Sequence, residues 1–207
     1  MIRRVQVVAL ALVAATPLLA QTPKGWLMRV DRSTSARDPD TGGAIKFVTM
    51  GSGFHATNPL AAVYWNPANT ATGNYTLKGT FTLMKPSGHT NYYGLVFGGS
   101  DMGGPAQNYL YFMVAQDGTW MIKQRASYQT HEVARRASDA VKRPDATGKS
   151  TNALEVRVMA DKIDYLVNST VVDSTPKNGM TASTDGIYGL RVNHLLEVHI
   201  DGLAVSK

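Results

Sequence analysis

Short segments that alternate apolar and polar residues constrain the fold of this chain more than any other feature. The run YLYFMVAQDGTWMIKQR at residues 109–125 is typical, because its two apolar segments are interrupted once, at Gln116, Asp117 and Gly118. Similar segments rich in Val, Ile, Tyr, Phe and Thr recur along the chain, bounded by Gly, Pro, Asn and Asp. This pattern is typical of antiparallel sheets with one packed face and one wet face. We therefore predict an all-β fold.

The predicted strands follow one another closely and leave no long helical segment. Residues 131–142 could hold a short helix, but their apolar spacing is poor for one. The chain shows no internal repeat and no linker, so a single domain at residues 21–207 is the simplest organisation. The expected strands are 26–32, 45–50, 53–57, 61–65, 74–84, 91–98, 108–115, 119–125, 153–160, 163–168, 170–173, 187–193 and 195–201.

The loop between the two apolar segments of residues 109–125 decides which side chains share a face. A two-residue turn would place Phe112 opposite Lys123 and mix apolar residues with cations. A three-residue loop pairs Phe112 with Ile122 instead, and Gly118 suits the left-handed last position of such a loop. We predict the three-residue loop, because a one-residue slip turns a whole strand inside out. The face opposite Phe112 then carries Tyr109, Tyr111, Met113, Met121, Lys123 and Arg125.

Two further hairpins are marked by the same alternation. In LEVRVMADKIDYLVN (154–168) apolar residues alternate with charged ones, and a second turn is expected at Asn168 and Ser169. In IYGLRVNHLLEVHID (187–201) Leu190 and Val192 alternate with Arg191 and Asn193. Each hairpin is therefore expected to present one apolar face and one polar face.

The first twenty residues carry the pattern of a secretory signal peptide. Arg3 and Arg4 precede an apolar stretch at residues 5–19, and Ala20 offers a small residue before a cut. We expect cleavage near Ala20 and a secreted product, either extracellular or periplasmic. A retained N-terminal anchor is the alternative, because Leu18 is imperfect at the −3 position. After cleavage no other apolar run approaches the length of a membrane span.

The absence of cysteine and the modest charge exclude several classes of function. Without Cys there is no thiolate zinc site and no Cys nucleophile, and an exported domain must rely on burial and sheet hydrogen bonds. The net charge of +6 falls to +4 without Arg3 and Arg4, and it is spread thinly, so we expect no nucleic-acid partner. The densest basic segment, 131–143, contains Glu132 and Asp139 and is interpreted as a solvated strand and loop rather than a phosphate-binding patch.

Several segments carry a resemblance to a known family: NYTLKGTFTLM (74–84), YYGLVFGGSD (92–101), the 109–125 run, NALEVRV (152–158), DYLVNSTVV (164–172) and DGIYGLRVNHLLEVHIDGL (185–203). Together, over about residues 26–205, they resemble the concanavalin A-like lectin/glucanase superfamily. The order is similar to that of laminin-G-like modules and of secreted 3-keto-disaccharide hydrolase-like domains. The resemblance implies a jelly-roll sandwich of two antiparallel sheets, often with a glycan groove on the concave sheet and sometimes a calcium ion at its rim. Ser169 stands where the family commonly has Gly, a departure that concerns the turn alone.

The carboxylates do not show the spacing of a glycosidase. Retaining glucanases of this superfamily resemble one another in an E-x-D-x-x-E strand, and their reaction needs two carboxyls about 5 Å apart. The three glutamates, Glu132, Glu155 and Glu197, lack that spacing, and the nearest pair, Asp161 and Asp164, flanks a hairpin turn. The five histidines show no metal-ligand spacing. The sequence thus leans against catalysis and indicates no catalytic residue, with a hydrolase or lyase of the 3-keto-disaccharide type as the alternative.

The glycine-rich loop GGSDMGGPAQN (98–108) raises the question of a metal. Asp101 could offer its carboxylate and nearby carbonyl oxygens to Ca²⁺, a cation that prefers oxygen ligands. A plain turn is the competing interpretation. Apart from such a structural calcium ion we expect no cofactor.

A sugar site needs flat aromatic faces and planar hydrogen-bonding groups. The candidates are Tyr92, Tyr109, Tyr111, Lys123, Arg125 and Arg191, if they line one sheet. The competing interpretation is that the tyrosines are ordinary strand residues packed under loops, and we expect Trp26, Trp65 and Trp120 in the core. We predict a non-catalytic, lectin-like protein with a polysaccharide or glycan partner. An extracellular structural or adhesion protein with an exposed apolar patch is a further alternative, and the oligomeric state is left open.

Overall fold

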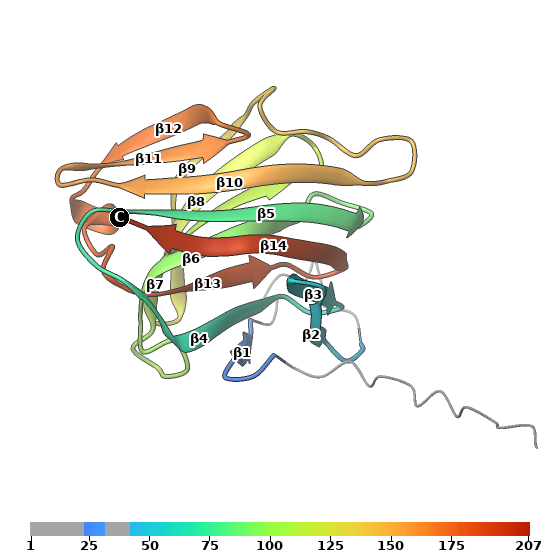
Figure 1. Ribbon diagram of the computed structural model, residues 1–207, viewed down its shortest axis with the longest axis horizontal. Helices are drawn as coiled ribbons and strands as arrows, with labels where there is room; N and C mark the ends of the chain where they lie inside the picture. The colour runs from blue at the N-terminus through green and yellow to red at the C-terminus, as the bar shows by residue number, and fades with distance from the viewer. Residues whose placement is uncertain (1–22, 32–41) are drawn as a thin grey trace, which may run out of the picture.

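The computed structural model describes residues 23–31 and 42–207, which form two seven-stranded antiparallel sheets (Figure 1). The predicted jelly-roll sandwich is confirmed. Sheet A consists, in spatial order, of β1 (Leu27–Val30), β4 (Ala62–Ala71), β13 (Gly186–Val192), β6 (Tyr92–Ser100), β7 (Asn108–Ala115), β8 (Thr119–Ala126) and β9 (Gln129–Ala137). Sheet B consists of β12 (Thr170–Pro176), β11 (Lys162–Val167), β10 (Ser150–Val158), β5 (Tyr75–Lys85), β14 (Leu196–Ser206), β3 (Gly53–Asn58) and β2 (Lys46–Met50). A short 3₁₀ helix, η1 (Gly179–Thr181), follows β12.

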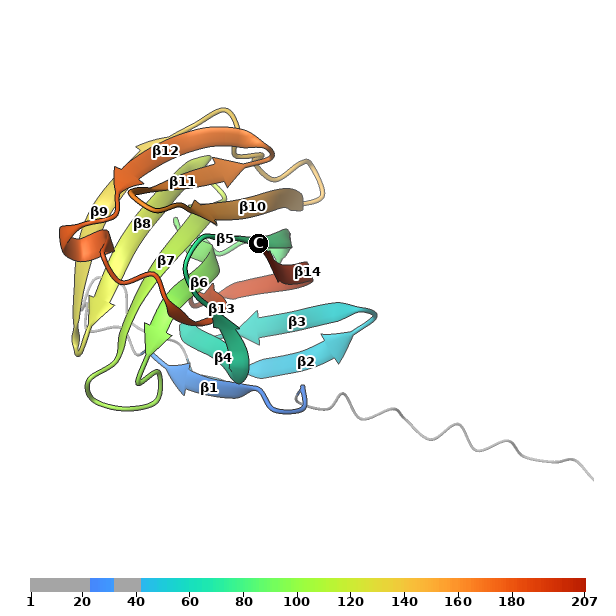
Figure 2. The same cartoon turned by 60° about the vertical axis from the view of Figure 1, so that its left-hand side comes forward.

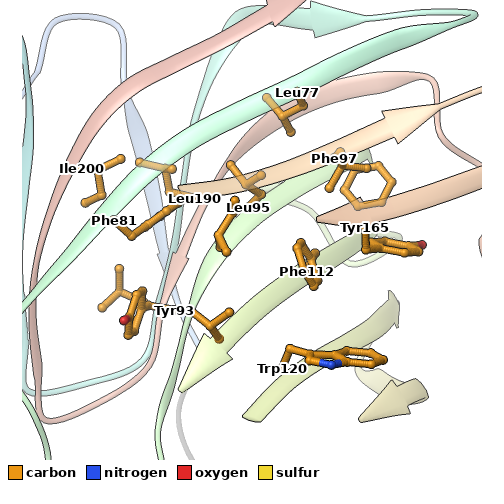
Figure 3. Close-up of a cluster of buried hydrophobic side chains, with 14 of the residues drawn as sticks. Leu77, Phe81, Tyr93, Leu95, Phe97, Phe112, Trp120, Tyr165, Leu190 and Ile200 are labelled. Carbon is orange, nitrogen blue, oxygen red and sulfur yellow. The ribbon is translucent and has the colours of Figure 1, made fainter. Parts of the chain in front are cut away.

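The main core lies between the two sheets. Successive side chains of a strand point to opposite faces, so each strand supplies every second residue to this layer. Phe81 of β5 comes from sheet B, Phe112 of β7 and Trp120 of β8 come from sheet A, and all three are buried (Figure 3). The ring of Phe112 lies 5.3 Å from that of Tyr165 on β11, a contact that joins the two sheets.

The β7–β8 hairpin has the predicted three-residue loop. Phe112 pairs with Ile122 and Val114 with Trp120, and the loop consists of residues 116–118. Gly118 has a φ of +87°, the left-handed conformation that glycine adopts without a steric cost. The predicted segregation is therefore confirmed: the aliphatic and indole groups of this hairpin face sheet B, and Tyr109, Tyr111, Lys123 and Arg125 face the other way.

The predicted turn at residues 168–169 joins β11 to β12. Asn168 and Ser169 both have positive φ, at 49° and 69°. The Asn168 side chain compensates for this conformation, because its Oδ1 accepts a hydrogen bond from Ala153 N at 2.9 Å and its Nδ2 donates to Ala140 O at 2.8 Å. The turn therefore forms with Ser in place of the family's common Gly.

Some element boundaries differ from the sequence prediction. The interpretation of residues 131–143 as a solvated strand and loop is confirmed, because residues 129–137 form β9, the largely exposed edge strand of sheet A, and the short helix considered for residues 131–142 does not form. The strands β4 and β14 also run further than expected, to Ala71 and Ser206. Pairing with β13 extends β4, and pairing with β5 extends β14, both contacts between distant segments.

The predicted signal peptide, residues 1–20, lies outside the described residues, so the structure does not test it. Within residues 23–31 and 42–207, no helix is long and apolar enough to span a membrane.

Candidate ligand-binding site on the outer face of sheet A

The outer face of sheet A is the face that points away from sheet B. In Figure 2 the strands of this sheet run from β9 at the upper left to β1 at the bottom. Strand register places all six predicted ligand-binding residues on this face, together with a second apolar cluster separate from the main core. That cluster consists of Val63, Trp65, Tyr92, Val96, Met102, Tyr109, Tyr111, Met113, Ala115 and Met121.

The tyrosines of this face are covered rather than open to water. Tyr109 is 1% exposed and Tyr111 is 2% exposed. The guanidinium group of Arg29 lies 5.8 Å from the ring centre of Tyr109, and that of Arg191 lies 5.3 Å from the ring centre of Tyr111. The prediction that these tyrosine rings contact a sugar through bare aromatic faces is therefore wrong, because arginine side chains already lie over the rings.

Asp31 lies at the centre of the polar groups on this face. Its Oδ1 accepts a hydrogen bond from Arg29 Nη2 at 3.1 Å, and its Oδ2 accepts one from Arg125 Nη2 at 2.8 Å and another from Arg191 Nη1. We call these four residues the arginine cluster. Tyr109 completes it, since its hydroxyl lies 3.1 Å from Arg29 Nη2.

The arginine cluster shows that the outer face is concave. Asp31 directly follows β1, whereas Arg125 belongs to β8, and β1 and β8 are five strand spacings apart in the sheet. Five spacings correspond to about 24 Å in a flat sheet, which the two side chains could not bridge. The sheet must therefore curl toward this face. Gly94 of β6 lies between Arg191 and Met113 in the sheet, and a Cβ there would lie 2.2 Å from Phe112 O, so the close approach of β6 and β7 needs glycine at this position.

The arginines determine the ionisation of Asp31. Burial alone raises the pKa of this carboxyl, but the charges of Arg191, Arg125 and Arg29 and a hydrogen bond from Arg191 outweigh it and leave the pKa at about 2. Burial alone would lower the pKa of Arg191. The nearby charge of Asp31 outweighs burial, and the pKa of Arg191 is raised. Both groups stay ionised at neutral pH.

The low pKa of Asp31 predicts a loss of stability in acid. A carboxyl whose folded pKa lies below its unfolded value stabilises the fold above the unfolded pKa, near 3.8, and loses that contribution as the pH falls through the folded pKa, about 2. We expect this group to contribute about 2 kcal/mol to the free energy of unfolding, lost between about pH 5 and pH 1. Urea titrations at stepped pH measure it, and a flat stability profile below pH 4 would contradict it.

Lys123 lies beside the cluster and opposite Glu132 on β9, but no hydrogen bond or ion pair joins these two side chains. It pairs across the strands with Tyr111, is half-buried, and makes no hydrogen bond or ion pair with any residue in the described part of the chain. Burial lowers the pKa of Lys123, and the nearby Glu132 charge offsets this only in part. A half-buried cation without a partner is a group left available for a ligand.

Tyr92 is on the outer face but away from the arginine cluster. It pairs with Ala115 at the end of β7 opposite to Tyr109, and its hydroxyl lies 2.9 Å from Thr119 Oγ1. The fold thus gathers five of the six predicted residues and leaves Tyr92 at the far end. Trp65, expected in the main core, is buried instead in the outer-face cluster.

Arg29 and Asp31 were missed by the sequence analysis. The signal that could have found them is their spacing, because residues two apart on a strand point to the same face. Their partners could not be found from the sequence, since Asp31 and Arg191 are 160 residues apart.

Asp101, the predicted calcium ligand, closes the loop after β6. Its Oδ2 accepts a hydrogen bond from Ala106 N at 2.8 Å, and its carbonyl oxygen accepts one from Gly104 N at 2.9 Å. Over residues 23–31 and 42–207, no three His, Asp or Glu side chains are grouped so that they could hold a metal ion. The loop geometry therefore accounts for Asp101 as a turn residue, and the calcium ion stays a prediction.

The fold pairs histidines that show no pattern in the sequence. On the outer face of sheet B, His55 and His199 are opposite one another, and their Nε2 atoms lie 3.1 Å from Glu197 Oε1 and 3.0 Å from Asp201 Oδ2. They line a groove of about 520 Å³. In the carboxylate pair Asp161 and Asp164, the Asp164 carboxylate accepts hydrogen bonds from both Lys162 and Ser174.

Comparison with known proteins shows the fold class. No family model and no curated protein matches the chain. The carbohydrate-binding module CBM66 from Bacillus subtilis has a TM-score of 0.64 and 11% identity, over 88% of this chain and 96% of its own. A Bacillus subtilis protein of unknown function with a galectin-like fold has a TM-score of 0.61 and 16% identity, over 88% and 89% of the two chains.

A family 16 glycoside hydrolase, an endo-glucanase from Bacteroides ovatus, has a TM-score of 0.59 and 9% identity, over 90% of this chain and 96% of its own. At such identities the likeness concerns the fold. The chain has the concanavalin A-like jelly-roll fold.

Proposed function

We propose that this protein is a secreted, non-catalytic carbohydrate-binding protein and that its glycan binds the outer face of sheet A. The observation that carries the proposal is the meeting of Lys123, Arg125 and Arg191 on a concave face of a lectin-type sandwich. Guanidinium and ammonium groups donate several hydrogen bonds each, which hydroxyl and carboxylate oxygens of sugars can accept. The similar structures named a carbohydrate-binding module and an endo-glucanase support a sugar as the ligand.

In this proposal the tyrosines hold the arginine side chains in position. The Tyr109 hydroxyl accepts a hydrogen bond from Arg29 Nη2, and the ring of Tyr111 lies beneath the Arg191 guanidinium. These contacts limit the rotamers of the arginines before any ligand arrives, which reduces the entropy lost on binding. The glycan then contacts the polar heads of the cations, and the tyrosines contribute through position.

A binding role is favoured over the hydrolase alternative by the state of Asp31. A glycosidase needs one carboxyl with a raised pKa to protonate the leaving oxygen. The carboxyl at the centre of this site has a pKa of about 2, so it holds no proton to donate at neutral pH. The other carboxylate that the described residues place on this face, Glu132, is bound by Arg135 at 2.8 Å.

Replacing Arg125 by glutamine tests the site. We expect the wild-type protein to be retarded in affinity electrophoresis through at least one polysaccharide gel, and Arg125→Gln to bind about tenfold more weakly, since a hydrogen bond to a charged group is lost. Arg136→Gln is the matched control, because Arg136 is an exposed arginine on β9 outside the cluster. Circular dichroism confirms that each variant is folded.

The same gels separate the alternatives. Failure to bind any polysaccharide at millimolar site concentrations would refute the proposal. Release of reducing sugar by the wild-type protein would support the hydrolase instead. Self-association on size-exclusion chromatography at low concentration, without glycan binding, would favour the structural or adhesion protein.

A further inference from the structure

Positive charge exceeds negative charge on the outer face of sheet A. Among the described residues, strand register and ion pairing place five cations there: Arg29, Lys123, Arg125, Arg135 and Arg191. Two carboxylates share the face with them, Asp31 and Glu132, and Glu132 already binds Arg135. The site therefore carries more cationic groups than the carboxylates beside it can neutralise.

The single negative charge of Asp31 cannot neutralise the three positive charges of the arginines in the cluster. Its Oδ1 is occupied by Arg29, and its Oδ2 is shared by Arg125 and Arg191. One negative charge thus faces three positive ones at a carboxyl that is 9% exposed. Both oxygens already accept hydrogen bonds, and among the described residues no second carboxylate forms an ion pair with these three arginines.

Two donors next to each other remain unpaired. The Nε of Arg125 is buried and has no hydrogen-bond partner among the described residues, and the Lys123 ammonium has none there either. Residues two apart on one strand point to the same face about 7 Å from each other. A buried donor without a partner carries a desolvation cost, so the residues around Arg125 compensate its charge incompletely.

We propose that the glycan is an acidic polysaccharide and that its carboxylate or sulfate group binds between Lys123 and Arg125. The inference rests on the proposed function of this face and names its class of ligand. The Lys123 ammonium offers donors and a point charge to the oxygens of a carboxylate or sulfate, and the Arg125 guanidinium, whose Nη1 and Nη2 already bind Tyr128 O and Asp31, adds a second positive charge beside it. A neutral sugar would leave the excess charge uncompensated.

The test compares three polymers on one protein. Binding is measured by affinity electrophoresis in polygalacturonate, which supplies carboxylates, in dextran sulfate, which supplies sulfates, and in neutral dextran. We expect at least tenfold tighter binding to one or both acidic polymers than to dextran, with an affinity that falls as salt is raised. The acidic gel that retards the protein shows whether the site binds carboxylate or sulfate groups.

Lys123→Met provides the critical variant. It keeps the length of the side chain and removes the charge, and because Lys123 has no internal ion pair the fold should keep its stability. We expect about tenfold weaker binding to the acidic polymer, so that the preference of the protein for this polymer over dextran is reduced. Lys78→Met is the matched control, since Lys78 is exposed on the outer face of sheet B.

The outcomes separate this inference from the proposed function. Binding to neutral polysaccharides without binding to acidic ones would overturn the inference and leave carbohydrate binding in place. Equal losses in Lys123→Met and Lys78→Met would overturn it too, because they would indicate general attraction between a basic protein and a polyanion. Absence of binding to every polysaccharide would overturn both.

Discussion

Replacing Asp31 by asparagine is expected to lower the free energy of unfolding by about 3 kcal/mol, because it leaves buried arginines without their shared anion. The arginine side chains of the cluster are only 10–18% exposed and cannot recover full hydration. Asparagine keeps the volume of the side chain, so the loss reports charge and not packing. Urea unfolding at pH 7, followed by circular dichroism, measures the change.

Asp139→Asn is the control, because Asp139 is exposed in the segment after β9. Its free energy of unfolding should match the wild type within about 0.5 kcal/mol. The Asp31→Asn variant should also lose the part of the stability decline below pH 4 that Asp31 causes, whereas Asp117, Asp145 and Asp164, whose pKa values are lowered as well, still contribute. An unchanged acid profile would show that other carboxyls cause the decline, and an unchanged stability at pH 7 would contradict the structural role of the cluster.

Phe112→Ala is expected to cost about 3–5 kcal/mol of stability, because it opens a cavity in the main core. Phe112 is fully buried between the sheets and its ring contacts that of Tyr165. The same residue decides the orientation of the β7–β8 hairpin on which the candidate site depends. Chemical denaturation with a constant m-value measures the loss.

Tyr111→Phe is the comparison variant, because Tyr111 is next to Phe112 in the chain but lies on the outer face of sheet A. It keeps the ring beneath the Arg191 guanidinium and removes only the hydroxyl. We expect a change of stability within about 1 kcal/mol. A small cost for Phe112→Ala would mean that this side chain does not face the core, and the arrangement of the outer face would then be wrong as well.

The register of the β7–β8 hairpin was predictable from a local rule. The length of the loop at residues 116–118 decides whether Phe112 pairs with Lys123 or with Ile122. In the structure it pairs with Ile122. Local turn chemistry at Gly118 and the alternation of the flanking strands act on the same short segment. For this reason the shared face of Tyr109, Tyr111, Lys123 and Arg125 could be predicted.

Residues 129–137 show the limit of that reasoning, because the segment 131–143 was interpreted as a solvated strand and loop but was not placed among the expected strands of the sheet. The segment has little apolar periodicity because β9 is an edge strand with mostly exposed side chains. Its strand conformation comes from pairing with β8, and a weak local pattern gives no sign of such a partner. The histidine pair of β3 and β14 was missed for the same reason, since its two members are brought together by sheet pairing alone.

The sequence by itself determined that the chain forms strands, which side chains of the β7–β8 hairpin share a face, and that carboxylates with glycosidase spacing are absent. These properties depend on neighbours within a few residues, where side-chain alternation and turn conformation act. Only the tertiary structure decided that Arg29 and Asp31 join Arg125 and Arg191, and that arginines cover the tyrosine rings. Those contacts depend on sheet order and curvature, which arise from packing two sheets over residues far apart in the chain.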